Sequence, residues 1–259
     1  MKILLVAAMP SESEDIISTF GMTLKNKLAN FCPIYRTRKN EKNIYLLQTH
    51  VGLINASVAT ALAIQEIKPD AVIKVGCIGG NAPGLKKNDI IVPLSFFHSG
   101  AWITKSYISG KPTSDSSEWQ SLYGDEPYQN NKDNLGGLDY SYSPDENLTD
   151  TYKNVLENQA QRYVEAHLGS GDMVIFDHKF MDNIRQNILK STNPNIKWCT
   201  DNESYAIAQV CKVFGVPFTG IYFIASSDYE DIDGYNPDAI RNQMQQTILP
   251  VIKQFIDKI

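Results

Sequence analysis

The feature that most constrains the fold is a continuous apolar run over residues 71–75 that leads directly into a glycine-rich segment, residues 76–80. One charged residue, Lys74, interrupts the run. Apolar runs without alternation are typical of strands buried on both faces, as in the parallel sheets of α/β proteins. A glycine-rich segment after such a strand exposes backbone N–H groups at its carboxyl end. We therefore expect a central strand that ends in a turn suited to a ligand.

Strands and helices are predicted to alternate along the rest of the chain. Apolar runs and alternating patterns predict strands over residues 2–8, 31–38, 43–50, 71–75, 89–94, 162–168 and 217–225. Helical spacing predicts helices over residues 12–20, 55–67, 152–160, 180–188 and 201–211 and a long one from residue 237 onward. Ser11 or Ser13 is the expected cap of the first helix, and Asn55 that of the second. This alternation is typical of an α/β layered fold.

Length, charge and composition narrow the class of protein. A chain of 259 residues is compatible with one α/β domain. Its net charge of −5 argues against nucleic acid or an anionic membrane as a partner. The short apolar start, residues 3–9, favours a buried first strand over a signal sequence, and no later run has the ~18 apolar residues of a membrane span. The four cysteines show neither paired spacing nor a metal pattern with histidine, so we interpret them as free thiols in a reducing cytoplasm.

Residues 99–160 differ from the rest of the chain. They are rich in Ser, Tyr, Asn, Asp and Gly, and residues 130–137 have the composition of an exposed loop. A connection this long inside a compact domain is usually a lid, a binding loop or partly disordered. We therefore expect one domain over residues 1–259 with an atypical, loop-rich insertion at about 99–160, which could form a lid or part of an interface.

Polar or glycine-rich residues recur at predicted strand ends. They occur at residues 8–12, 76–80 and 170–172 and as the carboxylate pair Glu203 and Asp228. Each has an ordinary structural explanation, since glycine-rich segments are usually only turns and an acid such as Glu12 often interacts with a helix dipole. A buried carboxylate nevertheless needs a partner, and a ligand is one candidate.

Taken together and in this order, these segments resemble the nucleoside phosphorylase/nucleosidase superfamily. Within it, the chain is most similar to the 5′-methylthioadenosine/S-adenosylhomocysteine nucleosidases. The resemblance covers most of the chain and rests on residues 2–12, 52–70, 76–80 followed by Asp89, 170–172, 203–208 and 227–228. Residues 98–102 also look like a branch that includes plant storage-protein relatives. The resemblance implies a single-domain, three-layer α/β/α fold with a central mixed twisted sheet.

The resemblance also implies a hydrolase that releases the base of a purine nucleoside. Asp228 would protonate the leaving base, Glu203 would hold the ribose hydroxyls, and Glu12 would activate water. Substrate contacts are implied for Met9, Cys77, Ile78, Gly79, Val174, Ile175, Asn202 and Ser227. No metal or cofactor is implied. A cytoplasmic homo-oligomer is expected, with a dimer favoured.

The choice between water and phosphate as nucleophile depends on charge. Phosphorylases of this superfamily carry an arginine-containing turn after the first strand, and arginine suits phosphate because of its planar fork. Here an acid, Glu12, occupies that turn, which favours water. Lys74 keeps the alternative open because it lies where some phosphorylases have a phosphate-contacting arginine; otherwise it is a lysine that reaches solvent from a strand end.

Three positions depart from the nucleosidase pattern. Ile224 replaces an arginine that helps to hold water, Val174 replaces an aromatic residue that stacks on the base, and Asn202 replaces a methionine. Asn202 predicts a more polar 5′ substituent. Trp102 or Tyr205 could supply the missing stacking surface, with core or interface packing as the other interpretation of each.

Three functions therefore compete. The first is hydrolysis of an adenine nucleoside such as 5′-methylthioadenosine or S-adenosylhomocysteine. The second is phosphorolysis by the same fold. The third is a non-catalytic purine-binding or storage protein, favoured by Ile224 and Val174 but opposed by the presence of all three carboxylates.

Overall fold

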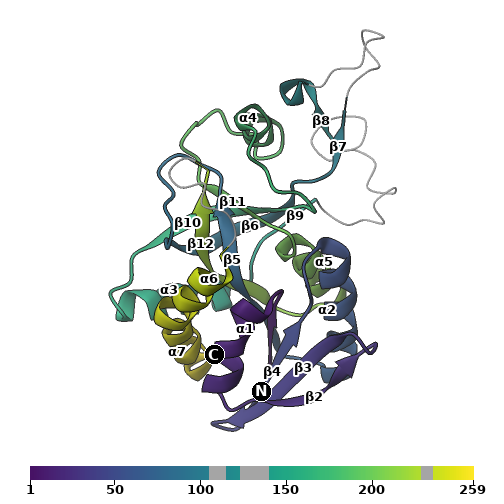
Figure 1. Cartoon of the computed structure of the whole chain (residues 1–259), viewed down its shortest axis with the longest axis vertical. Coiled ribbons are helices and arrows are strands. Elements are labelled where there is room, and N and C mark those ends of the chain that lie inside the picture. Colours follow the sequence, from purple (N-terminus) through teal and green to yellow (C-terminus); the bar gives the residue numbers. More distant parts are fainter. Residues whose placement is uncertain (105–114, 123–139, 229–235) are drawn as a thin grey trace.

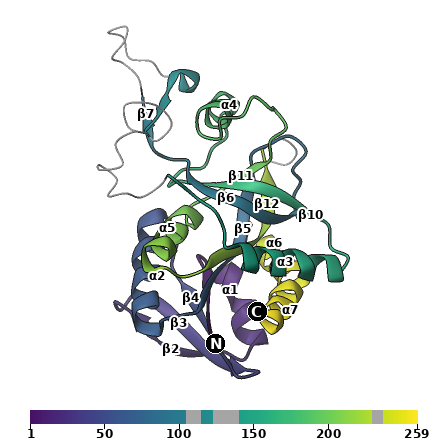
Figure 2. The same ribbon diagram turned by 180° about the vertical axis from the view of Figure 1, so that it is seen from behind.

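The computed structural model of the chain describes residues 1–104, 115–122, 140–228 and 236–259. Within these residues, ten strands form one mixed sheet and helices cover both of its faces (Figures 1 and 2). The predicted α/β/α architecture with a central mixed sheet is confirmed. None of the described helices is both long enough and apolar enough to cross a membrane.

The elements follow the predicted alternation. The strands of the sheet are β1 (Lys2–Ala7), β2 (Thr23–Leu28), β3 (Cys32–Lys39), β4 (Lys42–Gln48), β5 (Ala71–Gly80), β6 (Ile90–His98), β9 (Ser141–Tyr142), β10 (Tyr163–Ser170), β11 (Trp198–Asp201) and β12 (Phe218–Ser227). The helices are α1 (Pro10–Thr19), α2 (Leu53–Ile67), α3 (Glu146–Asn158), α4 (His178–Asn187), α5 (Ser204–Phe214), α6 (Pro237–Gln243) and α7 (Leu249–Lys258). A π-helical turn, Met244–Ile248, joins α6 to α7, so the predicted long C-terminal helix contains an irregular turn. Strands β2 and β11 were not predicted.

Strand β5 occupies the centre of the sheet. It pairs in parallel with β1 on one side and with β12 on the other. From β12 the sheet continues through β6 and β10 to β11, and β11 then pairs antiparallel with the end of β5. The five strands β5, β12, β6, β10 and β11 thus form a closed ring of paired strands. The carboxyl ends of β5, β11 and β12 lie next to one another in it.

The glycine-rich segment 76–80 belongs to β5, so the prediction of a turn there was wrong. A Cβ atom on Gly80 would lie 3.2 Å from side-chain atoms of Ile224 and Leu85. A Cβ atom on Gly76 would lie 2.2 Å from Glu12 Oε1 and 2.8 Å from Lys74 Nζ. Gly76 and Gly80 therefore let β5 continue where the side chains around it leave no space for a Cβ atom.

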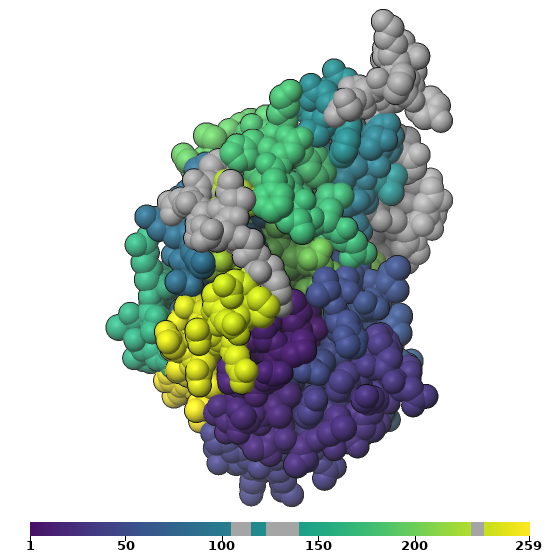
Figure 3. Space-filling view, in the orientation of Figure 1, coloured from purple at the N-terminus to yellow at the C-terminus, as the bar shows by residue number. Residues whose placement is uncertain are grey.

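Two apolar layers hold the helices to the sheet. Helices α2 and α5 pack together over one face, and their buried residues share one core with Val6, Val72 and Leu168. Helices α1, α3 and α7 bury apolar residues in a second core with Ile73 and Phe223. On the face seen in Figure 3, the C-terminal helices lie against the N-terminal helix α1.

Both predicted helix caps were wrong. The N-cap of α1 is Met9, and the Glu12 side chain accepts from the Met9 backbone N–H at 3.1 Å. Helix α2 begins after Gly52, two residues before Asn55, whose amide donates to the carbonyl of Val51. Carboxylates from distant segments contact the start of α2 instead, which local sequence patterns do not reveal.

The early part of the insertion forms a small two-stranded sheet of its own, whereas its later part, β9 and α3, joins the main sheet and the second core. Strands β7 (Trp102–Ile103) and β8 (Gln120–Ser121) pair with each other. The rings of Trp102 and Trp119 lie 4.8 and 5.3 Å from that of Phe180 in α4. The predicted exposed loop over residues 130–137 lies outside the described residues, and the proposed lid or interface role of the insertion stays a prediction.

Candidate active site

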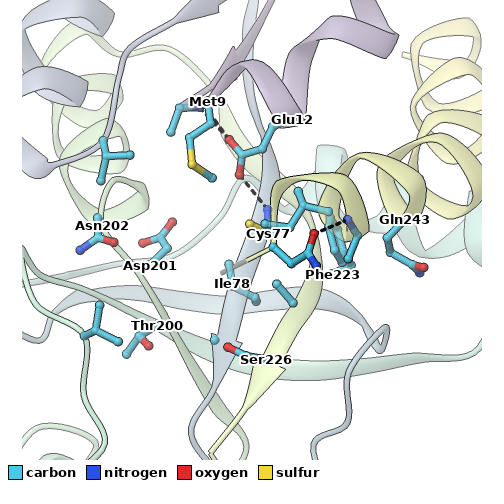
Figure 4. Close-up of a pocket in the computed structure, with 18 of the residues that line it drawn as sticks. Met9, Glu12, Cys77, Ile78, Thr200, Asp201, Asn202, Phe223, Ser226 and Gln243 are labelled. Carbon is cyan, nitrogen blue, oxygen red and sulfur yellow. Dashed lines mark hydrogen bonds between the residues drawn. The ribbon is translucent and has the colours of Figure 1, made fainter. Parts of the chain in front are cut away.

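A cavity of about 440 Å³ lies at the carboxyl ends of β1, β5, β11 and β12. Its walls include residues from segments 8–12, 77–79, 87–88, 173–176, 200–203 and 223–226 and from helix α6. Glu12 and Met9 meet Cys77 on one side, and Thr200 to Asn202 line another (Figure 4). Segments far apart in the sequence therefore converge on one space.

The Glu12 carboxylate lines this cavity although it is almost fully buried. Its Oε2 accepts from the backbone N–H groups of Ala8 and Met9 at 2.9 and 3.1 Å. Its Oε1 accepts from the backbone N–H of Cys77 at 2.9 Å (Figure 4). Each carboxylate oxygen can accept two hydrogen bonds. Oε1 accepts one from the backbone, so it can still accept a hydrogen bond from a water molecule.

Lys74 lies between two carboxylates. Its Nζ is 3.6 Å from Glu12 Oε2 and 3.9 Å from Glu203 Oε2, and the residue is only 1% exposed. Despite the desolvation that opposes the charge, Glu12 and Glu203 raise the pKa of Lys74. The interpretation of Lys74 as a lysine that reaches solvent was wrong, because it is the buried cation of an acidic cluster.

Glu203 lies at the start of α5 and faces the start of α2. Its Oε1 accepts from the backbone N–H of Gly52 at 3.1 Å. Burial raises the pKa of Glu203, while Lys74 acts to lower it. The neighbouring Asp201 serves the fold, since it accepts hydrogen bonds from the hydroxyls of Ser170 and Ser204.

Asp228 follows β12 and has different surroundings. Its Oδ2 accepts from the Asn81 side-chain amide at 2.6 Å, and its backbone N–H donates to the carbonyl of Gly80. Burial raises the pKa of Asp228 to about 6, opposed by the hydrogen bond from Asn81 and the charge of His178. A carboxyl group with a raised pKa is suited to donate a proton near neutral pH.

Most of the residues predicted to contact substrate line the cavity. These are Met9, Cys77, Ile78, Gly79, Val174 and Asn202. Among the described residues, Ile175 and Ser227 do not line it. Ile175 is part of the apolar core, and the Ser227 hydroxyl is buried and donates to the carbonyl of Leu85 at 2.7 Å. The structure thus gives these two side chains packing roles.

The Cys77 thiol also lies at the cavity. Burial, with Glu12 beside it, raises the pKa of this thiol well above its usual range. Cys77 is therefore unsuited to act as a thiolate nucleophile. The described residues also contain no group of three or more His, Cys, Asp or Glu placed to hold a metal ion.

Neither predicted substitute for the stacking aromatic lies at the cavity in the described structure. Trp102 packs on Phe180, and Tyr205 is buried against His98. Phe176 instead lines the cavity and is 58% exposed. Phe176 follows Val174 by two residues. An aromatic side chain thus lines the cavity two positions after the one at which the nucleosidase pattern has it.

Ile224 and Asn202, which also depart from the nucleosidase pattern, have different environments. Ile224 is completely buried in the core beside Gly80, so it presents no polar group to the cavity. Asn202 lines the cavity, and its Nδ2 donates to the carbonyl of Gly171. The amide is thus held in place at the cavity wall.

Comparison with known sequences identifies relatives that cover nearly the whole chain. A sequence model of the phosphorylase superfamily matches residues 2–257. The 5′-methylthioadenosine/S-adenosylhomocysteine nucleosidase of Haemophilus influenzae (strain PittEE) is 30% identical over 225 residues, which are 87% of this chain and 86% of that protein. The enzyme of the same name from Actinobacillus succinogenes is 27% identical over 228 residues, with 88% and 86% covered.

Solved structures share the fold over the entire chain. A mutant futalosine hydrolase of Helicobacter pylori has a TM-score of 0.79 at 17% identity, with 100% of both chains covered. A mutant 5′-methylthioadenosine/S-adenosylhomocysteine nucleosidase of Helicobacter pylori, with 5′-methylthioadenosine in its active site, has a TM-score of 0.78 at 16% identity, covering 100% of this chain and 99% of the other.

Proposed function

The chain belongs to the phosphorylase superfamily, and from this premise we propose that it is a nucleosidase acting on an adenine nucleoside. It hydrolyses the N-glycosidic bond of 5′-methylthioadenosine, S-adenosylhomocysteine or a related nucleoside to the free base and a ribosyl product. Its relatives of 27–30% identity carry the name of this activity. The observation that carries the proposal is the buried cluster of Glu12, Lys74 and Glu203, two of whose members line the cavity.

The three carboxylates divide the reaction between them. Glu12 orients water and accepts its proton as the water oxygen bonds to C1′ of the ribose. The bond between C1′ and the purine breaks, and its electron pair moves into the base, which Asp228 protonates. Glu203 accepts hydrogen bonds from the ribose hydroxyls beside the developing positive charge. Negative groups placed there stabilise the transition state more than the ground state.

The charge distribution supports water rather than phosphate as nucleophile. A phosphate would enter a cavity whose lining includes three acids, Glu12, Asp201 and Glu203, and one lysine, Lys87. In the described part of the chain, Lys74 is not a lining residue, and its ammonium is already within 4 Å of two carboxylates. A cation engaged in this way cannot compensate the charge of an anionic nucleophile without unpairing a buried acid.

The side chain at position 202 is proposed to select the 5′ substituent. Asn202 presents a polar amide at the cavity wall, which supports a substrate with a polar 5′ group. We expect Asn202→Met to shift the ratio of kcat/KM values for 5′-methylthioadenosine and adenosine toward the thioether by about tenfold, because methionine presents an apolar side chain to the 5′ group where asparagine presents a polar one. An unchanged ratio would remove Asn202 from this role; Asn195→Met, an exposed change, is the matched control.

A substrate panel tests the proposed function. Base release is measured for 5′-methylthioadenosine, S-adenosylhomocysteine, adenosine, inosine and uridine, each with and without phosphate. Release from adenine nucleosides without phosphate is expected, and strict dependence on phosphate would instead establish phosphorolysis. The Asp228→Asn variant, purified in parallel, should turn over about 10²–10⁴-fold more slowly and thus excludes a contaminating enzyme. Base binding without release from any nucleoside would favour the storage-type alternative.

Two further properties are proposed with this function. The chain is expected to form a homo-oligomer, with a dimer favoured, and to reside in the cytoplasm. The four cysteines are free thiols, which supports a reducing compartment. Sedimentation of the purified protein over a range of concentrations tests the dimer, and a single species of 29.0 kDa would contradict it.

A further inference from the structure

Asn81 connects the ends of three strands. It directly follows β5, and its side chain is only 2% exposed. Its Nδ2 donates to Asp228 Oδ2 at 2.6 Å, beyond the end of β12. Its Oδ1 accepts from the hydroxyl of Thr200 in β11 at 2.7 Å. One buried amide therefore joins the carboxylate to a hydroxyl on a different strand.

The direction of these hydrogen bonds is fixed by their chemistry. An ionised carboxylate only accepts hydrogen bonds, so the amide must turn its NH₂ group toward Asp228. Its oxygen then faces Thr200, whose hydroxyl can donate. If the amide were reversed, its oxygen would face a carboxylate oxygen, and two acceptors would meet in a buried place. Asp228 thus sets the orientation of the amide, and the Thr200 hydroxyl anchors the amide there by donating to its oxygen.

We infer that Asn81, held by Thr200, is a positioning residue for the proton donor and sets the pH range in which Asp228 acts. This inference rests on the proposed function of Asp228. Because Asn81 occupies Oδ2, the transferable proton resides on Oδ1, the oxygen that remains for the leaving base. Asn81 thereby selects both the orientation of the carboxyl group and the oxygen that carries its proton.

The same contact adjusts the acidity of the carboxyl group. Hydrogen bonding to the charged form of an acid lowers its pKa, and the Asn81 amide acts in this direction, against the raising effect of burial. Among the charged groups of the described residues, His178 at the start of α4 also lowers the pKa of Asp228. Removing the Asn81 donor should therefore yield a weaker acid that stays protonated to higher pH.

The experiment is the dependence of kcat/KM on pH for the wild type and four variants. This quantity reports the ionisation of the free enzyme, and the wild-type value should fall as pH rises and Asp228 loses its proton. Asn81→Leu keeps a similar volume but lacks the donor, so the falling limb should move about one pH unit higher. At the optimum, kcat should decrease about tenfold with little change in KM.

Thr200 supplies the matched pair of variants. Thr200→Val removes the hydroxyl and should move the falling limb in the same direction but by a smaller amount. Thr200→Ser keeps the hydroxyl, so the pH of its falling limb should stay at the wild-type value. This pair decides the question even if Asn81→Leu does not fold. The exposed change Asn195→Leu controls for nonspecific effects. A limb that stays in place in both Asn81→Leu and Thr200→Val would overturn the inference and leave Asn81 a purely structural residue.

Failure of the inference and failure of the proposed function give different results. An active wild type with an unmoved limb in the variants contradicts only the inference. A wild type that releases no base contradicts the function. In that case, adenine binding measured by calorimetry over the same pH range still reads the protonation of Asp228. Binding should persist to higher pH in Asn81→Leu than in the wild type, and identical pH dependence would overturn the inference.

Discussion

Glu12 and Asp228 are both carboxylates that follow strands of the sheet, yet their surroundings are opposite. Glu12 lines the cavity, whereas Asp228 lies just beyond the end of β12, two residues after the lining residue Ser226. Glu12 is almost fully buried and is surrounded by three backbone N–H groups and the ammonium of Lys74. Asp228 is half-buried, its side-chain partner is the neutral amide of Asn81, and burial raises its pKa to about 6. One region surrounds a carboxylate with positive groups, and the other favours its protonated form.

This difference shows how one chemical group can take two roles. An acid that accepts a proton and an acid that gives one must differ in their affinity for protons, and environment is the means available to a protein. The proposed division of labour between Glu12 and Asp228 follows from it.

Glu12→Gln should have the largest effect. An amide cannot accept the proton of water, and its NH₂ group would face either the backbone N–H donors of residues 8 and 9 or that of residue 77, so kcat should fall by about 10²–10⁴-fold. Steady-state kinetics measure the fall, and circular dichroism verifies folding. Glu14→Gln, two residues along α1 in an exposed pair with Arg241, is the control and should retain the wild-type rate. Substantial hydrolysis by Glu12→Gln would end its assignment as the base.

Lys74→Met tests the other half of the acidic cluster. It leaves two buried carboxylates without their cation, so the free energy of unfolding should decrease by about 3–5 kcal/mol. Denaturant titration at neutral pH measures the loss. Lys179→Met, which removes the exposed partner of Asp115, should cost less than about 1 kcal/mol. Equal losses in the two variants would show that Lys74 does not compensate a buried charge.

Phe176→Ala should separate binding from proton transfer. Stacking of a base on an aromatic ring contributes about 1–3 kcal/mol, so KM should rise by about 5- to 150-fold with kcat nearly unchanged. Initial-rate measurements over a range of substrate concentrations resolve the two constants. Phe214→Ala changes a phenylalanine of similar exposure at the end of α5 and serves as control. A fall in kcat alone would place Phe176 outside base binding.

Besides slowing turnover, Asp228→Asn should change stability, by less than Lys74→Met does. Because the folded-state pKa of Asp228 is raised, its protonated form stabilises the fold at low pH, and this contribution is lost as pH rises through about 6. Asparagine does not titrate. The free energy of unfolding of the variant should therefore rise relative to that of the wild type between about pH 4 and pH 6, and the difference should stay constant above pH 6. Thermal unfolding of both proteins at pH 4 and pH 7.5 measures it. A difference independent of pH would contradict the raised pKa.

The sequence predicted the strand and helix order because apolar periodicity reports burial, and burial determines the layers. It also indicated the carboxylates, since Glu12, Glu203 and Asp228 follow or flank apolar runs. It did not reveal that Lys74 is buried, because a lysine inside an apolar run is equally compatible with a strand end. The pairing of β11 with β5 was also beyond reach, since a four-residue strand has too short a pattern. That pairing brings Thr200 to Asn81, which is why the Asn81 contact was missed.

The position of β12 in the sheet has a consequence for the synthesis of the chain. In the sheet, β12 lies between β5 and β6, although among the described strands it is synthesised last. Until residue 218 emerges, the nascent chain exposes an unpaired edge of its most central strand, and such edges pair readily with other chains. Any truncation before β12 should therefore yield an aggregating product as well as an inactive one. Activity and solubility should thus both depend on the synthesis of β12.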